Sequence, residues 1–225
     1  MELSDRTIQV LKNYAGINPN LVFQQGKEIK TISVAKNVLS KTTVEEEFPF
    51  EFGIYDLNEF LSVLSLVDRP NLKFEEKHVV VGDSTGRSRI KYFFSDPEML
   101  TTPSKDIVMP ECEVNFVLDT RTLSSLKSAA SALGHTEISI RPSSGAVTLS
   151  VLDSKDATSN VFSVDVDGSY PEGVDFNFIL NVNNLKVVGE DFEVGVSSKL
   201  ISNFKSKQSN LEYFIALEKS STYGA

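Results

Sequence analysis

LSDRTIQVLKNYAGIN, residues 3–18, has the spacing of an amphipathic helix. Ile8, Leu11 and Ala15 fall on one face, with Tyr14 beside them, because residues three and four apart lie on the same side of a helix. Ser4 stands just before these positions, and a serine side chain there can accept a hydrogen bond from the first free backbone amides. We therefore predict a helix that begins after Ser4 and buries this apolar stripe.

A second segment repeats the pattern 115 positions later, at residues 118–134, LDTRTLSSLKSAASALG. At this offset Arg6 aligns with Arg121, and Lys12 with Lys127. Agreement in charge as well as hydrophobicity indicates an internal duplication and two structurally similar domains. The aligned apolar pairs are Ile8 with Leu123, Leu11 with Leu126 and Ala15 with Ala130.

Most of the remaining sequence predicts antiparallel strands. Runs such as HVVVGD (78–83) and TEISIRP (136–142) are rich in β-branched residues, and turn sequences separate them. Two more helices are predicted at residues 56–67 and 181–189, each after a strand with alternating phenylalanines. The predicted fold class is α+β, with two similar domains that each pack two helices on antiparallel β-sheet.

The domain boundary is predicted within SDPEMLTTPSKDIVMPE, residues 95–111, whose three prolines suit a connector better than a central strand. We expect an N-terminal domain over residues 1–105 and a C-terminal domain over residues 106–225. The last residues, EKSSTYGA, read as a loose tail.

Composition excludes several classes of protein. The formal net charge of the 225 residues is −9, which is unlike a protein that binds nucleic acid over its whole surface. No apolar run is long enough to cross a bilayer, and no basic-then-apolar leader precedes the first helix. A single cysteine, Cys112, fits a reducing compartment. A cytoplasmic protein is expected.

Cations nevertheless gather on the predicted polar helix faces. Arg6 and Lys12 lie there on the first helix and Arg121 and Lys127 on the third, with no carboxylate beyond the first turn; Lys186 on the fourth helix could join them. One interpretation is a solvated helix face. The other is a surface that meets DNA phosphates without reading base sequence.

A family resemblance bears on this choice. The runs GIYDLNEFLSVLSLV, FNFILNVNNLK and YFIALE, together with the first helix, resemble the DNA polymerase sliding clamp of T-even-type bacteriophages from the first residues to the last strand. The resemblance implies the DNA-clamp fold, with three subunits closed head to tail around duplex DNA as a processivity factor. The cations Arg6, Lys12, Arg121, Lys127 and Lys186 would then face the DNA.

The same resemblance implies partners and a location. These are double-stranded DNA, a DNA polymerase, an ATP-dependent clamp loader and two more copies of the chain, in the cytoplasm of an infected bacterial cell; transcription factors are a further class of partner. A docking pocket is expected near the connector, and ordinary packing of the connector onto the sheets is the alternative. Its candidate residues are Met99, Leu100, Ile107, Val108, Met109 and Pro110.

Catalysis has little support in the sequence. His78, His135 and Cys112 lie far apart and are interpreted as structural or surface residues, and no cofactor or metal is expected. The acidic run at residues 45–47 is interpreted as a solvated strand edge. Two alternatives to a clamp stay open: an acidic β-rich structural or protein-interaction module, and a hydrolase with dispersed carboxylates.

Overall fold

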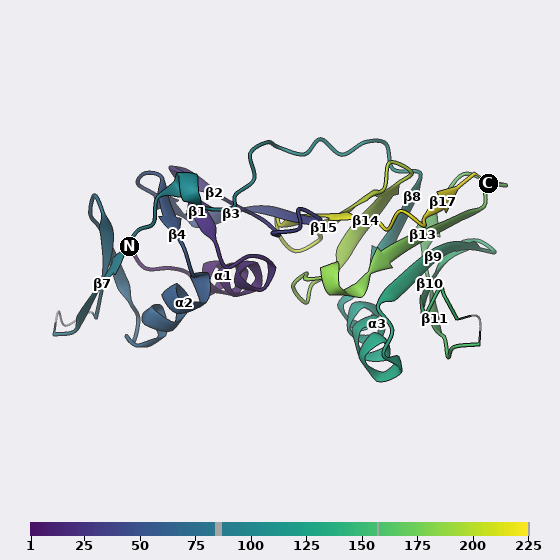
Figure 1. Ribbon diagram of the computed structural model, residues 1–225, viewed down its shortest axis with the longest axis horizontal. Coiled ribbons are helices and arrows are strands. Elements are labelled where there is room, and N and C mark those ends of the chain that lie inside the picture. The colour runs from purple at the N-terminus through teal and green to yellow at the C-terminus, as the bar shows by residue number, and fades with distance from the viewer. Residues whose placement is uncertain (84–86, 157, 225) are drawn as a thin grey trace. The chain divides into compact units, whose positions relative to one another are not determined.

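The computed structural model describes residues 1–83, 87–156 and 158–224, and it divides into two compact units, Met1–Asp106 and Ile107–Ala225 (Figure 1). Each unit combines α-helix with antiparallel β-sheet and has a hydrophobic core of its own. The predicted α+β class with two similar domains is confirmed.

In the first unit, β1 pairs with β4, β2 with β3, and β5, β6 and β7 form a three-stranded antiparallel sheet. The two α-helices of its described residues contact each other (Figure 1). The element bounds are α1 Asp5–Ile17, β1 Leu21–Phe23, β2 Gly26–Ile32, β3 Val38–Phe48, β4 Phe52–Ile54, α2 Leu57–Ser65, β5 Asn71–Phe74, β6 His78–Gly82, β7 Arg89–Phe93 and the 3-10 turn η1 Pro97–Met99.

Helix α1 begins where the sequence predicts. The Ser4 side chain accepts from the backbone N–H of Thr7 at 3.2 Å and caps the helix. The buried stripe is rotated from the predicted one, however, because Ile8 and Ala15 are only half-buried. The Tyr14 ring fixes the rotation, since it is fully buried and its hydroxyl accepts from Ser40 at 3.1 Å. The fully buried positions are Thr7, Val10, Leu11, Tyr14 and Ile17.

Phenylalanines fill the core of the first unit. The rings of Phe23 and Phe52 stack at a centroid distance of 4.7 Å, and Phe48 lies 4.5 Å from Phe23. These rings come from β1, β3 and β4, so burial of their apolar surface, worth about 1.5–3 kcal/mol per side chain, holds the short strands together.

In the second unit, β11, β10, β9, β13 and β17 follow one another in one antiparallel sheet, and β12, β8, β14, β15 and β16 in another. Helix α3 packs against β10 and β11. The element bounds are β8 Val114–Leu118, α3 Thr120–Leu133, β9 Glu137–Ser143, β10 Ala146–Leu152, β11 Phe162–Val166, β12 Gly168–Ser169, β13 Phe176–Asn181, the 3-10 turn η2 Val182–Asn184, β14 Phe192–Ser197, β15 Ile201–Ser206, β16 Glu212–Ala216 and β17 Thr222–Tyr223.

The fourth predicted helix is wrong. Residues 181–189 form only the turn η2, which Asn181 caps, followed by an irregular segment. Leu185, Val187 and Val188 are all buried in that segment, a spacing that no single helix face provides. The segment also contains three asparagines and three valines, which have weak helix propensity. Lys186 therefore lies on a loop.

The C-terminal residues are ordered in part, against the prediction of a loose tail. Strand β17 pairs with β13, with Tyr223 opposite Phe176. The Tyr223 ring also stacks on Phe178 at 5.9 Å. An aromatic side chain near the chain end thus closes one edge of the sheet.

Candidate nucleic-acid interface and docking surface

The polar face of α1 carries two of the predicted DNA-facing cations. Lys12 is exposed, whereas Arg6 is half-buried and its guanidinium donates to the side chain of Gln9 at 3.0 Å. Gln9 is itself exposed beside them. Both charges therefore stand on the solvent side of α1.

The polar face of α3 is built mainly from small side chains. Arg121, Ser124, Ser128 and Ser131 are exposed along it, and Asp119 caps the helix by accepting from Thr122 N–H at 2.6 Å. Short hydroxyl side chains let a large ligand approach the helix closely, and Arg121 supplies the charge.

Lys127 differs from its repeat partner Lys12. It is half-buried, and its ammonium donates to the backbone carbonyl of Val187 at 3.3 Å. Burial lowers the pKa of Lys127. This bond joins α3 to the loop that bears the exposed Lys186, so the structure brings Lys127 and Lys186 into one neighbourhood. A shallow groove beside α3 is lined by Thr120, Leu123, Ser124, Lys127, Ser128, Ser131, Ala132 and Gly189.

Carboxylates anchor the first turns of α1 and α3, which sequence reasoning missed. Glu46 of β3 accepts from the Ser4 N–H and from the Thr7 hydroxyl. Asp191 accepts from the Thr120 N–H at 2.8 Å and from its hydroxyl at 2.9 Å. A negative charge at a helix N-terminus is favourable, so each anchor fixes and stabilises its helix.

The prediction of a solvated acidic run at residues 45–47 is wrong for its middle member. Glu45 and Glu47 are exposed, but Glu46 faces the interior because side chains alternate along a strand. Burial raises the pKa of Glu46, but hydrogen bonds from Thr7 and Ser4 outweigh this effect and hold it below its usual value. The alternation of side chains along this strand, with Val44 and Phe48 on the same face as Glu46, could have revealed the burial of Glu46 from the sequence.

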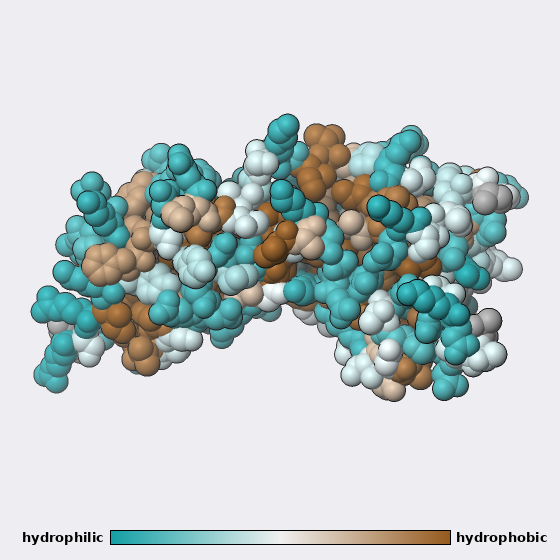
Figure 2. All heavy atoms as spheres, viewed as in Figure 1, coloured by the Kyte–Doolittle hydropathy of each residue, from teal (hydrophilic) through white to brown (hydrophobic). Residues whose placement is uncertain are grey.

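The candidate docking residues divide by exposure. Met99 is 84% and Val108 is 89% exposed, whereas Ile107, Met109 and Pro110 are half-buried. Figure 2 shows hydrophobic side chains where the connector crosses the top of the view. Leu100 is only 8% exposed and touches Gly53, so it packs in the core of the first unit.

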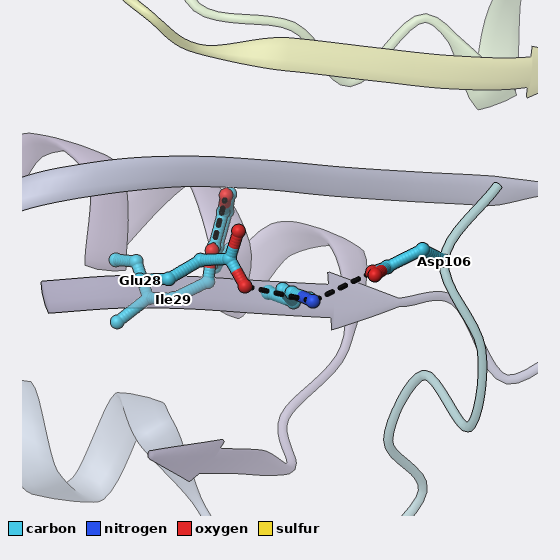
Figure 3. Close-up of polar contacts among 5 residues, drawn as sticks. Glu28, Ile29 and Asp106 are labelled. Carbon is cyan, nitrogen blue, oxygen red and sulfur yellow. Dashed lines mark hydrogen bonds and ion pairs between the residues drawn. The ribbon is translucent and has the colours of Figure 1, made fainter. Parts of the chain in front are cut away.

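Polar tethers fix the first half of the connector. The Asn18 amide donates to the backbone carbonyls of Ile32 and Thr101 at 2.8 and 3.0 Å. Further along, the Lys30 ammonium lies between two carboxylates, 2.6 Å from Asp106 and 2.7 Å from Glu28 (Figure 3). Hydrogen bonds and charge from Asp106 and Glu28 raise the pKa of Lys30.

The second half of the connector borders a groove of about 640 Å³. Cys112 packs so closely on Gly195 of β14 that a Cβ there would lie 2.7 Å from the sulfur. A glycine inside a strand often marks such a close approach. Gly195 was therefore the feature of the sequence that could have predicted this contact. The groove is lined by Met109, Pro110, Cys112, Asn115, Phe116, Val117, Asp167, Gly168, Ser169, Glu193, Val194, Gly195, Asn203 and Lys205.

The two histidines have ordinary surroundings. His135 lies 2.9 Å from the backbone carbonyl of Asn160, and the ring of His78 packs on Phe93. Among the described residues, no group of three His, Cys, Asp or Glu side chains is placed to hold a metal ion. No described helix combines the length and hydrophobicity that a membrane span requires.

Two family models match the chain, one for each unit. "DNA polymerase processivity factor" matches residues 4–109, and "gp45 sliding clamp, C terminal" matches residues 115–219. The chain belongs to the sliding clamp family. The sliding clamp of Vibrio phage KVP40 is 35% identical to it over 224 residues, 97% of this chain and 99% of that protein. The sliding clamp of Escherichia phage RB69 is 30% identical over 99% of each chain.

Solved structures agree on the fold of this clamp. The proliferating cellular nuclear antigen of Entamoeba histolytica has a TM-score of 0.69 at 14% identity, over 94% of each chain. A. fulgidus PCNA, solved with the C-terminal region of FEN-1 bound, has a TM-score of 0.70 at 15% identity, over 98% of each chain. The predicted resemblance to phage sliding clamps is confirmed, and this clamp is a DNA polymerase processivity factor.

Proposed function

We propose that three copies of this clamp close head to tail around duplex DNA and hold the replicative polymerase on its template. The exposed polar face of α3 carries the proposal. In a chain of net charge −9, this face presents Arg121 among serines, with no acidic side chain in the first turn of the helix. Arg6 and Lys12 give α1 a similar character.

Such faces suit a protein that must stay on DNA and still slide. Arginine and lysine neutralise phosphates without regard to base sequence, and each contact breaks and reforms at little cost. The short serine side chains leave room for the phosphate backbone and offer no bidentate pair of groups to a base edge. Retention then comes from enclosure, and Lys127 and Lys186 add charge beside α3. An acidic exterior disfavours DNA elsewhere.

Partners would dock along the connector. Val108 and Met99 are exposed, and Met109 and Pro110 border the groove on the second unit. Apolar, flexible side chains of this kind suit peptide segments of a polymerase and of an ATP-driven loader. The clamp itself would perform no catalysis.

The test uses a polymerase and loader of a related phage on primed circular DNA, with product length as the readout. Reversing Arg6, Lys12 and Arg121 to glutamate should shorten the products to nearly those made without a clamp, because the phosphate contacts become repulsive. The matched control reverses three exposed lysines, Lys36, Lys199 and Lys207, and should leave product length unchanged. Full stimulation by the first variant would exclude these residues from DNA contact.

A further inference from the structure

The second unit has a loop where the first unit has its second helix. In the first unit, the chain leaves strand β4 and forms α2, which contacts α1. In the second unit, the chain leaves strand β13 and forms the turn η2 and then the irregular segment 185–189, which we call the α3 loop. A helix bonds its own backbone from one turn to the next, whereas a loop needs partners from elsewhere.

Burial along the α3 loop leaves one cation at the surface. Leu185, Val187 and Val188 are buried. Lys186 stands between the first two and is exposed. Because its neighbours on both sides pack in the core, the backbone of the loop decides where the Lys186 ammonium stands.

One peptide group of the loop is held at both of its polar ends. The Val188 N–H donates to the hydroxyl of Tyr213 at 3.3 Å, and Tyr213 is fully buried on β16. The carbonyl of the same peptide group, that of Val187, accepts from the Lys127 ammonium at 3.3 Å. Side chains of a strand and of α3 therefore fix this peptide group between them.

Lys127 is better placed to hold this carbonyl than to reach DNA. Its side chain is half-buried, whereas its repeat partner Lys12 is exposed. Burial lowers the pKa of Lys127, because a charge with less water around it depends more on its remaining partners. If the ammonium left Val187 for a phosphate, it would leave the carbonyl of a buried residue unpaired.

The loop and the polar face of α3 form one surface. Ser124 and Ser128 of α3 line the same groove as Gly189, the last residue of the loop. Lys186 therefore belongs to the surface that carries Arg121, and its position relative to α3 depends on what ties the loop to that helix.

We infer that Lys127 is a positioning residue, which holds the α3 loop so that Lys186, and not Lys127, contacts the DNA phosphates. The inference rests on the DNA-encircling function proposed above. It gives the duplicated lysines different roles: Lys12 meets DNA directly, whereas Lys127 acts through Lys186. The missing helix is the physical reason, since the loop in its place needs a tether from α3.

Duplex binding over a series of salt concentrations tests these roles. The full chain is titrated onto a short fluorescent DNA duplex, and fluorescence anisotropy gives the affinity. The slope of log affinity against log salt concentration falls by about 0.9 for each phosphate contact that is lost. Lys186→Met should reduce the slope. Lys127→Met should reduce it by no more than Lys186→Met does, because it acts only by displacing Lys186.

Double variants separate positioning from contact. Lys127→Met/Lys186→Met should lose no more of the slope than Lys186→Met alone, since the contact is already gone. The matched control, Lys12→Met/Lys186→Met, should lose the sum of its two single losses, because these lysines contact DNA independently. Additive losses from Lys127→Met and Lys186→Met would show that Lys127 touches phosphate itself.

Two further outcomes would overturn more. An unchanged slope in Lys127→Met or in Lys186→Met would overturn the inference, and a reduced slope in Lys12→Met would then leave the DNA-encircling function standing. Unchanged binding by Lys12→Met, by Lys186→Met and by the combined reversal of Arg6, Lys12 and Arg121 would overturn that function as well.

Hydrogen exchange of the DNA-free clamp tests the tether directly. The Val188 N–H should exchange faster in Lys127→Met than in the wild type, because its peptide group loses one of its two partners. Lys186→Met keeps both partners and should exchange as the wild type does. Equal exchange rates in all three proteins would show that Lys127 does not hold the loop.

Labelling of the wild-type clamp keeps the test decisive if Lys127→Met does not fold. An amine-reactive reagent is applied with and without loading onto circular DNA, and mass spectrometry locates the labelled lysines. DNA should protect Lys186 and leave the labelling of Lys127 unchanged. Equal protection of Lys127 and Lys186 would place both ammonium groups on the DNA and overturn the inference.

Discussion

The Glu46 carboxylate accepts a hydrogen bond from the Thr7 hydroxyl at 2.5 Å, which ties β3 to the first turn of α1. Asp191 does the same for α3 through Thr120. The offset of 115 that carries Ser4 onto the other cap, Asp119, carries Glu46 onto Val161, which has no carboxylate. The duplicated helices therefore keep an anchor of the same chemistry, supplied by a different element in each unit.

Glu46→Gln should lower the free energy of unfolding by about 1–3 kcal/mol, the range for leaving a buried hydrogen-bonding group without its partner. Ser4 and Thr7 donate to different oxygens of the carboxylate, and an amide offers only one oxygen, so one donor would lose its acceptor. Urea unfolding of both proteins measures the difference.

Glu45→Gln is the matched control, because it makes the same chemical change on the exposed face of the same strand. It should change stability by less than about 0.5 kcal/mol. Equal losses from Glu45→Gln and Glu46→Gln would show that the anchor contributes no stability.

Low pH should remove the contribution of Glu46 to the stability of the folded clamp. Its pKa lies below the usual 4.5 in the folded clamp, so the unfolded chain binds the proton first as pH falls. The stabilisation is complete above pH 4.5 and is lost as pH falls through the folded pKa. The difference in melting temperature between wild type and Glu46→Gln should therefore be constant near neutrality and shrink below about pH 4. A difference that stays constant down to about pH 2 would contradict a role for the charge.

Sequence patterns predicted much of this fold because local chemistry determines it. Ser4 and Asp119 cap helices at the predicted positions, since a short polar side chain before an apolar stripe has few other arrangements. The strands followed from β-branched runs between turns. The exposed cations of α1 and α3 also followed from helical spacing.

Other features depend on contacts between distant residues. The loop at 185–189 reads as a helix in isolation, but burial of Leu185, Val187 and Val188 overrides that tendency. The bond from Lys127 to Val187 joins residues 60 apart, which no local pattern encodes. Leu100 appears as connector in the sequence and lies in the core because Gly53 leaves room for it.

Thr31→Val should stabilise the clamp by about 1 kcal/mol. The Thr31 hydroxyl is buried and, among the described residues, finds no hydrogen-bond partner, which is costly for a polar group. Valine has nearly the same shape and favours a strand. Ser40 lies opposite Thr31 and donates to Tyr14, so Ser40→Ala should instead lose about 1 kcal/mol. Urea unfolding measures both, and a loss from Thr31→Val would show that its hydroxyl is satisfied in solution.

Val108→Asp should weaken the docking of partners without affecting the folding of the clamp. The side chain is 89% exposed, so the melting temperature should hardly change. If partners bury this part of the connector, a charge there is desolvated without a partner, and affinity for the polymerase should fall about tenfold or more. Binding of a related phage polymerase to immobilised clamp measures this effect. Val34→Asp, at an exposed valine in the turn after β2, is the control and should bind the polymerase like the wild type. Equal polymerase affinity of the two variants would show that the docking surface does not include Val108, because this part of the connector would then stay solvated in the complex.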